Sequence, residues 1–291
     1  MDDELLRWLY HRLLRDPSSS HTTDCTYSDG LIVFIFLFAA LGNHSSRWAC
    51  QKRHWPLWCR ALAFPSYSQL CRRLKSAAVQ RLLQQINQEC KSHLSRSGEL
   101  VADGKPLVVG GFSKDPDATV GKVPDGFARG YRAHVIADSA GIIEDFEVSG
   151  LHGGEATVMR QLVRGVDVRD KIIRADSNYD SNPLYGQVAD KGGRLIAPRR
   201  KPQRGLGHHP QHPHRLLAIA ELEQSPPRLA EHRRRRNRIE QILAHLTNLP
   251  CGLWALPNFV RRLWRVTMWI LAKITLYHLH QVLLQELRNA A

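Results

Sequence analysis

Hydrophobic residues recur at helical spacing over the first 95 residues of the chain. Leu5, Leu6, Leu13 and Leu14 fit one face of a helix, residues 31–41 form an apolar run, and residues 70–86 form a long amphipathic stretch. The break before the last stretch offers Ser66 or Ser68 as its N-cap. The pattern therefore predicts an all-helical N-terminal domain over residues 1–95.

From residue 96 onward the pattern changes to short runs that are typical of strands. Asp103 interrupts an apolar run over residues 100–109, and three strand segments are expected at 106–110, 131–138 and 142–149. Two of them are joined by Ser139-Ala-Gly141, which is a hairpin signal. Further segments follow as a helix at 155–166, a strand at 171–175, a helix at 181–190 and a strand at 194–197. The order β-β-β-α-β-α-β predicts an α/β domain with a mixed sheet flanked by helices.

Six prolines interrupt residues 198–227, and we therefore expect an irregular basic loop at 199–232. The remainder is helical and includes a long amphipathic stretch at 253–287. The second predicted domain thus spans residues 96–291, with the loop and the C-terminal helices included.

The charge of the chain is strongly positive, with a net value of +14 and a pI near 9.9. It is also unevenly distributed: residues 199–238 carry 11 Lys and Arg against 3 Asp and Glu, whereas residues 101–198 carry 12 against 14. An excess of this sign favours a polyanionic partner such as nucleic acid. We expect the N-terminal helical domain, with its basic stretch at 72–81, to bind DNA.

The sequence gives little indication of a membrane protein or a secreted protein. The most apolar run, residues 31–41, is too short to span a bilayer, and the acidic start is unlike a secretory signal. The six cysteines contain no C-x-x-C pair, so we expect reduced thiols and no zinc site. A cytoplasmic location without membrane contact follows as the expectation.

Three acidic residues lie where a metal-dependent phosphoryl-transfer enzyme needs carboxylates. Asp103 lies in the first strand-like run, Asp176 ends another, and Glu240 lies in a helix that follows a block of arginines. Oxygen ligands suit Mg²⁺, with Mn²⁺ as a substitute, and two such ions can activate a hydroxyl and stabilise the leaving oxygen of a phosphodiester. Asp103 is expected to bridge both ions. Ordinary alternatives stay open: a turn for Asp103, a turn cap for Asp176, and a helix-surface charge for Glu240.

Four segments together resemble the DDE transposases of bacterial insertion sequences. They are Asp103-Gly-Lys-Pro-Leu107, Gly130-Tyr-Arg-Ala-His134, Arg174-Ala-Asp-Ser-Asn-Tyr-Asp-Ser181 and Arg236-Asn-Arg-Ile-Glu240. The resemblance covers about residues 27–280. It implies a ribonuclease-H-like fold, cleavage of DNA at transposon ends with divalent metal ions, and transfer of the freed 3′ hydroxyl into target DNA.

The same resemblance assigns roles to individual residues. Asp103, Asp176 and Glu240 match the catalytic and metal-binding acids, and Arg236 matches an arginine that binds a phosphate near the scissile bond. Two positions depart from the family pattern, with Arg233 in place of a tyrosine and Thr247 in place of a lysine. Contacts of those two positions to transposon-end DNA are therefore in question.

Further basic residues are expected to contact DNA. They are Arg233, Arg234, Arg235, Arg236 and Arg238 in the late helix, and Arg199, Arg200 and Lys201 in the preceding loop. The histidine-rich segment 207–214 lies in the same loop, where its irregular spacing favours a flexible basic segment over a metal site.

Three functions are compatible with these residues. The first is an active transposase that works as a homodimer on terminal repeats and target DNA in the bacterial nucleoid. The second is an inactive transposase-derived DNA-binding protein, which the departures at Arg233 and Thr247 favour. The third is a metal-dependent nuclease on the same fold, which needs no specific binding to DNA ends.

Overall fold

The computed structural model describes residues 2–15, 26–206, 208–248, 252–253 and 255–290. The chain divides into two compact units: unit 1 contains residues 1–94 and 246–291, and unit 2 contains residues 95–245. The predicted boundary near residue 95 coincides with the first junction. The C-terminal residues, which we had assigned to the second domain, belong to unit 1.

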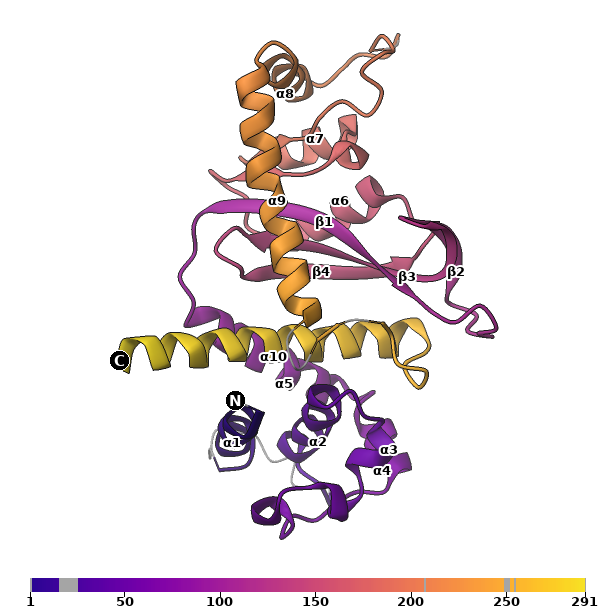
Figure 1. Cartoon of the computed structure of the whole chain (residues 1–291), viewed down its shortest axis with the longest axis vertical. Coiled ribbons are helices and arrows are strands. Elements are labelled where there is room, and N and C mark those ends of the chain that lie inside the picture. The colour runs from indigo at the N-terminus through magenta and orange to yellow at the C-terminus, as the bar shows by residue number, and fades with distance from the viewer. Residues whose placement is uncertain (1, 16–25, 207, 249–251, 254, 291) are drawn as a thin grey trace. The chain divides into compact units, whose positions relative to one another are not determined.

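Unit 1 is helical. Its helices are α1 (Asp2–Tyr10), α2 (Asp29–Leu41), α3 (Ser46–Ala49), α4 (Tyr67–Arg73), α5 (Ala77–Ser92) and α10 (Leu263–Ala290). The apolar run of the sequence is α2, in which every residue except Phe38 is buried. Helix α10 packs against α2 and α5 (Figure 1). Among the described residues, no helix has the length and apolar character needed to cross a membrane.

The stretch at 70–86 forms parts of two helices instead of the single helix that we predicted. Ser66 caps α4 in a reciprocal capping box with Gln69, as one of the two expected caps. The side chain of Ser76 then accepts a hydrogen bond from Val79 and caps α5. A second N-cap inside one amphipathic pattern restarts the helix, and hydrophobic spacing alone does not reveal it.

Unit 2 is built on a six-stranded mixed sheet. Its strands are β1 (Glu99–Val108), β2 (Thr119–Val123), β3 (Gly126–Asp138), β4 (Ile143–Gly150), β5 (Ile172–Arg174) and β6 (Arg194–Ile196). The order is β2-β3-β1-β5-β6, with β4 also paired to β3. Strands β1 to β4 pair antiparallel, whereas β5 and β6 run parallel to β1.

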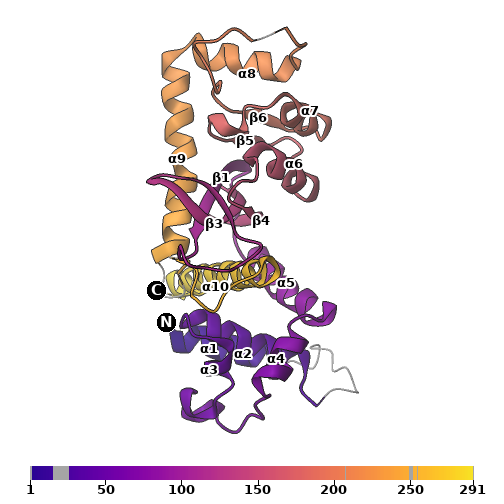
Figure 2. The same ribbon diagram turned by 90° about the vertical axis from the view of Figure 1, so that its right-hand side faces the viewer.

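Helices cover both faces of this sheet. They are α6 (Glu155–Gly165), α7 (Asn182–Asp190), α8 (Pro213–Glu223) and α9 (Pro226–Asn248). Figure 2 shows α9 on one face and α6 and α7 on the other. On the second face, Leu100 and Ile136 of the sheet pack with Leu162 of α6 and Leu184 of α7 in one buried cluster. The predicted class, a mixed sheet flanked by helices with a helical N-terminal region, is confirmed.

Residues 119–123 form strand β2, which is absent from the strands expected from the sequence. One local prediction was wrong. The supposed loop at 199–232 contains all of α8 and the start of α9. Pro213 and Pro226 begin these two helices, because proline lacks only an N–H that the first helical turn leaves unpaired in any case.

Candidate active site

Asp103 and Asp176 lie at the same level of two neighbouring strands. In the parallel pair of β1 and β5, Val101 is the register partner of Arg174. Asp103 and Asp176 each follow two residues later; Asp103 is in the middle of β1, where it pairs with Val135 of β3, and Asp176 lies just beyond the end of β5. A topology with parallel central strands thus brings together two carboxylates that are 73 positions apart in the sequence.

The carboxyl group of Asp103 is in an unusual electrostatic environment. Burial raises its pKa to about 6, and the negative charges of Asp176 and Glu240 add to the increase. The backbone N–H of Gly104, which donates to Asp103 at 2.7 Å, and the charge of Arg236 act in the opposite direction. The Asp103 carboxyl group is therefore under the influence of two other carboxylates and one guanidinium.

Asp176 both ends its strand and caps the short 3-10 helix Ser177–Tyr179. Its side chain accepts hydrogen bonds from the backbone N–H of Asn178 at 2.8 Å and from Asn178 Nδ2 at 3.2 Å. Asp180 forms an ion pair with Arg215, and Ser181 is the N-cap position of α7 without a side-chain hydrogen bond.

Helix α9 brings Arg236 and Glu240 to the same place from the other side of the sheet. The two residues are one helical turn apart and form an ion pair, and Arg236 Nη1 also lies 3.7 Å from Asp103 Oδ2. Glu240 remains more than half exposed, whereas Arg236 is about one-fifth exposed. The structure thus gathers Asp103, Asp176, Arg236 and Glu240 into one cluster.

The other arginines of α9 differ in their contacts. Arg235 pairs with Glu99 and Glu231, and Arg238 donates from Nε to the carbonyl oxygen of Ser139 at 2.7 Å. Arg233 and Arg234 are exposed. The four adjacent arginines therefore divide between structural ion pairs and exposed positions.

A cavity of about 860 Å³ opens beside Asp176. Its lining includes four arginines, namely Arg199, Arg200, Arg233 and Arg236, together with the buried His232. Arg199 is held in a bidentate ion pair with Glu223 of α8, while Arg200 is exposed. Lys201 of the predicted DNA-binding set is exposed but does not line this cavity. The cavity combines positive charge with a position next to the acidic cluster, and both suit a nucleic-acid backbone.

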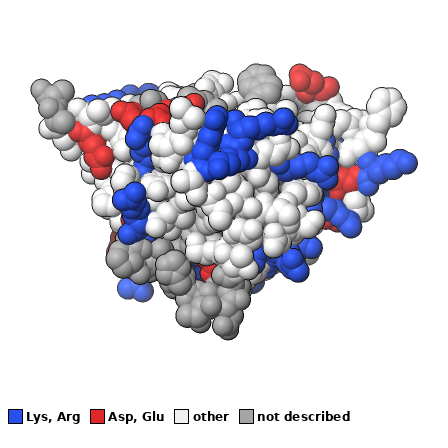
Figure 3. Space-filling view, turned by 90° about the horizontal axis from the view of Figure 1, so that it is seen from below, with Lys and Arg blue, Asp and Glu red and all other residues white. Residues whose placement is uncertain are grey.

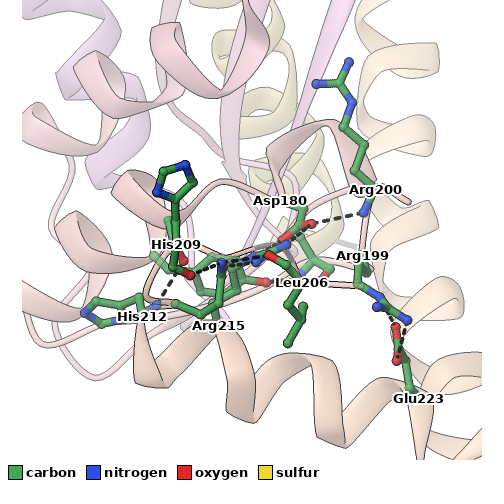
Figure 4. Close-up of polar contacts among 12 residues, drawn as sticks. Asp180, Arg199, Arg200, Leu206, His209, His212, Arg215 and Glu223 are labelled. Atoms are coloured by element: carbon green, nitrogen blue, oxygen red, sulfur yellow. Dashed lines mark hydrogen bonds and ion pairs between the residues drawn. The ribbon is translucent and has the colours of Figure 1, made fainter. Parts of the chain in front are cut away.

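Polar contacts fix much of the segment that joins β6 to α8 (Figure 4). Asp180 receives two hydrogen bonds from Arg215, at 2.6 and 2.7 Å, and one from the backbone N–H of Arg200 at 3.0 Å. Gln211 donates to the carbonyl oxygens of Leu206 and His209. Asn182 adds a hydrogen bond to the carbonyl oxygen of Pro210 and accepts one from the backbone N–H of His212. The flexibility expected around the histidines stays a prediction.

Two other carboxylates of unit 2 have structural roles. Asp138 is a turn residue, since it accepts hydrogen bonds from the backbone N–H groups of Ser97, Gly98 and Ala140. Asp115 is buried and accepts a hydrogen bond from the Tyr131 hydroxyl at 2.7 Å. A buried tyrosine hydroxyl needs a partner, and Asp115 supplies it.

Tyr179 and Glu155 belong to the surroundings of the cluster, although sequence reasoning missed both. Tyr179 is fully buried, and burial together with the charges of Asp103 and Asp176 holds its pKa well above the usual value. Asn178 Nδ2 lies between Asp176 and Glu155, and Glu155 forms an ion pair with Arg132. Tyr179 and Asn178 lie inside the segment 174–181, one of the four that resemble the transposase family. That resemblance is the sequence feature that could have identified them.

The donor atoms of the cluster fit a hard divalent cation. The residues are carboxylates, and the partly buried Asp103 has a raised pKa beside negative neighbours, so a nearby cation would relieve an existing repulsion. Among the described residues, no three His, Cys, Asp or Glu side chains lie close enough to form a ready metal site. The Glu240 carboxylate is instead paired with the Arg236 guanidinium.

Comparisons with known proteins agree with this arrangement. A family model described as transposase DDE domain matches residues 95–279. A cryo-EM structure of a piggyBac transposase synaptic complex with hairpin DNA resembles the chain with a TM-score of 0.50 at 12% identity. The similarity covers 96% of this chain and 71% of the other, and it concerns the fold. No match was found among curated proteins.

Proposed function

The chain belongs to the transposase DDE domain family, and from this membership we propose that it cuts DNA at the ends of an insertion sequence and joins the freed strand to target DNA. The observation that carries the proposal is the placement of Asp103 and Asp176 at the same level of two adjacent strands, with Arg236 and Glu240 supplied by α9. A carboxyl group with a raised pKa beside like charges and a basic cavity is typical of a functional site.

In the proposed mechanism, Asp103, Asp176 and Glu240 hold two divalent cations. When bound, such cations activate the attacking water or 3′ hydroxyl and stabilise the leaving oxygen of the phosphodiester. The backbone N–H of Gly104 orients the Asp103 carboxylate, and that of Asn178 does the same for Asp176. Preorganised ligands of this kind avoid the cost of ordering side chains during the reaction.

Arg236 has two successive roles in this proposal. Before substrate binds, its guanidinium partly compensates the charges of Asp103 and Glu240. If Glu240 held a cation, the guanidinium would be available to bind a phosphate oxygen of the DNA next to the scissile bond. Arginine suits this exchange because carboxylates and phosphates both accept its fork of N–H donors.

The arginine-lined cavity beside Asp176 is proposed to hold the DNA backbone on either side of the scissile phosphate. Arg200 and Arg233 contribute exposed charges, and Arg199 contributes charge from a fixed ion pair. We propose that the positive surface around the cavity also contacts DNA through Arg234, Arg235, Arg238 and Lys201. We also propose that unit 1 binds DNA, that the protein acts as a homodimer on terminal repeats and target DNA, and that it works at the bacterial nucleoid.

The experiment that tests this function supplies Mg²⁺ and a duplex with the terminal repeats that flank the reading frame. We expect a nick that leaves a 3′ hydroxyl, followed by a joined product with target DNA. Both products should disappear in Asp176→Ala. The matched control is Asp190→Ala, which removes an exposed carboxylate of α7 and should leave both products.

Two results would replace the proposal with one of its alternatives. Tight binding to the repeats without any cleavage would identify an inactive DNA-binding protein. Cleavage without preference for the repeats and without joining would identify a nuclease.

A further inference from the structure

Lys105 of strand β1 lies close to Asp103 and has no role in the site described above. Successive side chains of a strand point to opposite faces of the sheet. Leu100 and Ala102 of β1 pack in the buried cluster with α6 and α7. Asp103 and Lys105 therefore lie on the opposite face, which is the face of α9. At about 3.3 Å per residue, their backbone positions are about 7 Å apart.

The side chain of Lys105 is a half-buried cation without a protein anion. Burial lowers the pKa of its ammonium group, and no carboxylate of the described residues acts in the opposite direction. Lys105 forms no hydrogen bond or ion pair with any residue that the structure describes. A charge that is partly removed from water normally has a partner, because its lost hydration is otherwise uncompensated. Lys105 is therefore suited to an anion that the chain does not supply.

Other basic residues of the sheet are held by the protein itself. Arg132 of β3 forms an ion pair with Glu155, and Arg129 donates from Nε to the carbonyl oxygen of Ala118 at 3.1 Å. Many further Lys and Arg residues lie at the surface, as Figure 3 shows for the face of the molecule seen from below. Water solvates the charges of such surface residues. Lys105 differs from both groups because it is half-buried and unpaired.

Strand β1 has an open edge beside Lys105. β5 pairs with β1 only over Glu99–Val101, so no strand of the described chain lies along the next part of that edge, 102–108. Pro106 lies in this part and offers no N–H to a neighbouring strand. Asp176 follows the end of β5, where the open part begins. DNA that reaches Asp176 can therefore continue along this edge to Lys105.

We propose that Lys105 binds a DNA phosphate one or two nucleotides from the scissile phosphate and so holds the strand over the acidic cluster. A phosphate is the anion that this ammonium group lacks, and lysine binds phosphates as a point charge. Partial burial makes the attraction stronger than it is at a fully exposed lysine. The inference rests on the DNA substrate of the proposed function, and it adds a substrate-binding residue that lies beyond the carboxylates.

The test couples the lysine to individual phosphates of the substrate. In terminal-repeat duplexes, each phosphate nearest the cut, except the scissile one, is replaced in turn by an uncharged methylphosphonate. Cleavage rates of the wild-type protein and of Lys105→Gln are measured on each duplex with Mg²⁺. On the unmodified duplex, Lys105→Gln should cleave about 10- to 100-fold more slowly, as loss of one hydrogen bond to a charged group requires.

One modified position should identify the contact. At the phosphate that Lys105 binds, the methylphosphonate should slow the wild-type protein but slow Lys105→Gln little further, because the contact is already lost. At the other positions the two effects should multiply. Lys105→Gln should stay folded, since it removes a half-buried charge without a partner, and Lys105→Arg should retain part of the activity because it keeps the charge.

Lys122→Gln is the matched control. Lys122 is an exposed lysine of β2 that pairs with Phe127, whereas Lys105 pairs with Ala133, six residues later in β3. The two lysines are therefore about 20 Å apart along β3. This distance is too long for Lys122 to reach the same phosphate, so Lys122→Gln should cleave every duplex as the wild-type protein does.

The results separate this inference from the proposed function. If the wild-type protein cleaves the repeats and Lys105→Gln does so at the same rate, Lys105 does not bind the strand, and the function of the acidic cluster stands. The same holds if the loss in Lys105→Gln multiplies with the methylphosphonate effect at every position. If the wild-type protein cleaves none of the duplexes, the proposed function and this inference are both contradicted.

Discussion

The Nη1 atom of Arg236 lies 3.7 Å from the Oδ2 atom of Asp103. The same guanidinium forms an ion pair with Glu240, so one arginine side chain partly neutralises two of the three carboxylates that are proposed to hold metal. Asp103 and Glu240 come from elements on different layers of unit 2, and Arg236 links them electrostatically. The acidic site therefore contains its own counterion, the Arg236 guanidinium.

Removal of this counterion should make the stability of the protein depend on divalent cations. In Arg236→Gln, Asp103 faces Asp176 and Glu240 without compensation, and Tm without metal should fall by a few degrees, at about 2–4 °C per kcal/mol. Addition of Mg²⁺ should raise Tm more in this variant than in the wild type. Thermal unfolding with and without Mg²⁺ measures both effects. Arg234→Gln is the matched control, and an equal Mg²⁺ response in all three proteins would contradict the counterion role.

The ion pair between Asp180 and Arg215 should contribute strongly to the stability of unit 2. The Asp180 side chain is 2% exposed and accepts two hydrogen bonds from the guanidinium. Asp180→Asn leaves the Arg215 charge buried without its partner, and the free energy of unfolding should fall by about 3–5 kcal/mol. Urea unfolding measures the loss. Asp190→Asn, at an exposed position, should change it by less than about 0.5 kcal/mol. Similar values for both variants would disprove the contribution.

Stability should decrease in mild acid because of His134. This side chain is fully buried, and burial, assisted by the charge of Arg132, lowers its pKa from 6.5 to about 4. Below about pH 6.5, His134 binds a proton in the unfolded chain but stays neutral in the folded protein. The free energy of unfolding therefore decreases as the pH falls below that value.

His134→Gln removes this titration and tests it. Between about pH 7.5 and pH 5, the free energy of unfolding should fall by about 2 kcal/mol less in the variant than in the wild type. Urea unfolding at the two pH values supplies the numbers. His93→Gln changes an exposed histidine of unit 1 and should retain the wild-type pH dependence. An unchanged pH dependence in His134→Gln would refute the prediction.

The arginine-lined cavity should bind DNA through phosphates and not through bases. Arg200→Gln and Arg233→Gln should each weaken binding to duplexes of different sequence by a similar factor. Each should also reduce the slope of log K against log salt by about 0.9, since one phosphate contact is lost. A salt titration of binding measures the slope. Arg169→Gln removes an exposed arginine that does not line the cavity and should leave the slope unchanged. A sequence-dependent loss would instead indicate base contacts.

Much of unit 2 could be predicted from the sequence because its strands are short and separated by clear turn signals. Ser139-Ala-Gly141 marked the turn between β3 and β4, and the runs that end at Arg174 and Ile196 marked two parallel strands. Asp103 and Asp176 stood out since a carboxylate inside or at the end of an apolar run needs an explanation. Their juxtaposition follows from the pairing of β1 with β5.

Features that depend on tertiary contacts could not be predicted in the same way. The ion pair of Arg236 with Glu240 follows from their spacing, but its approach to Asp103 depends on how α9 lies on the sheet. The pairing of Asp180 with Arg215 joins residues 35 positions apart, and no local pattern specifies it.

A change of metal specificity tests most directly whether Asp103 and Asp176 hold the cations that support DNA cleavage. Asp103→Cys and Asp176→Cys replace a hard oxygen ligand with a thiolate, which Mg²⁺ binds poorly and Mn²⁺ tolerates better. With Mg²⁺, cleavage of terminal-repeat DNA should fall by about 1,000-fold or more, as loss of several kcal/mol of transition-state stabilisation requires. With Mn²⁺, part of the activity should return, and Asp190→Cys should behave as the wild type with both ions. Wild-type cleavage by Asp103→Cys and Asp176→Cys in Mg²⁺ would contradict the assignment of both acids.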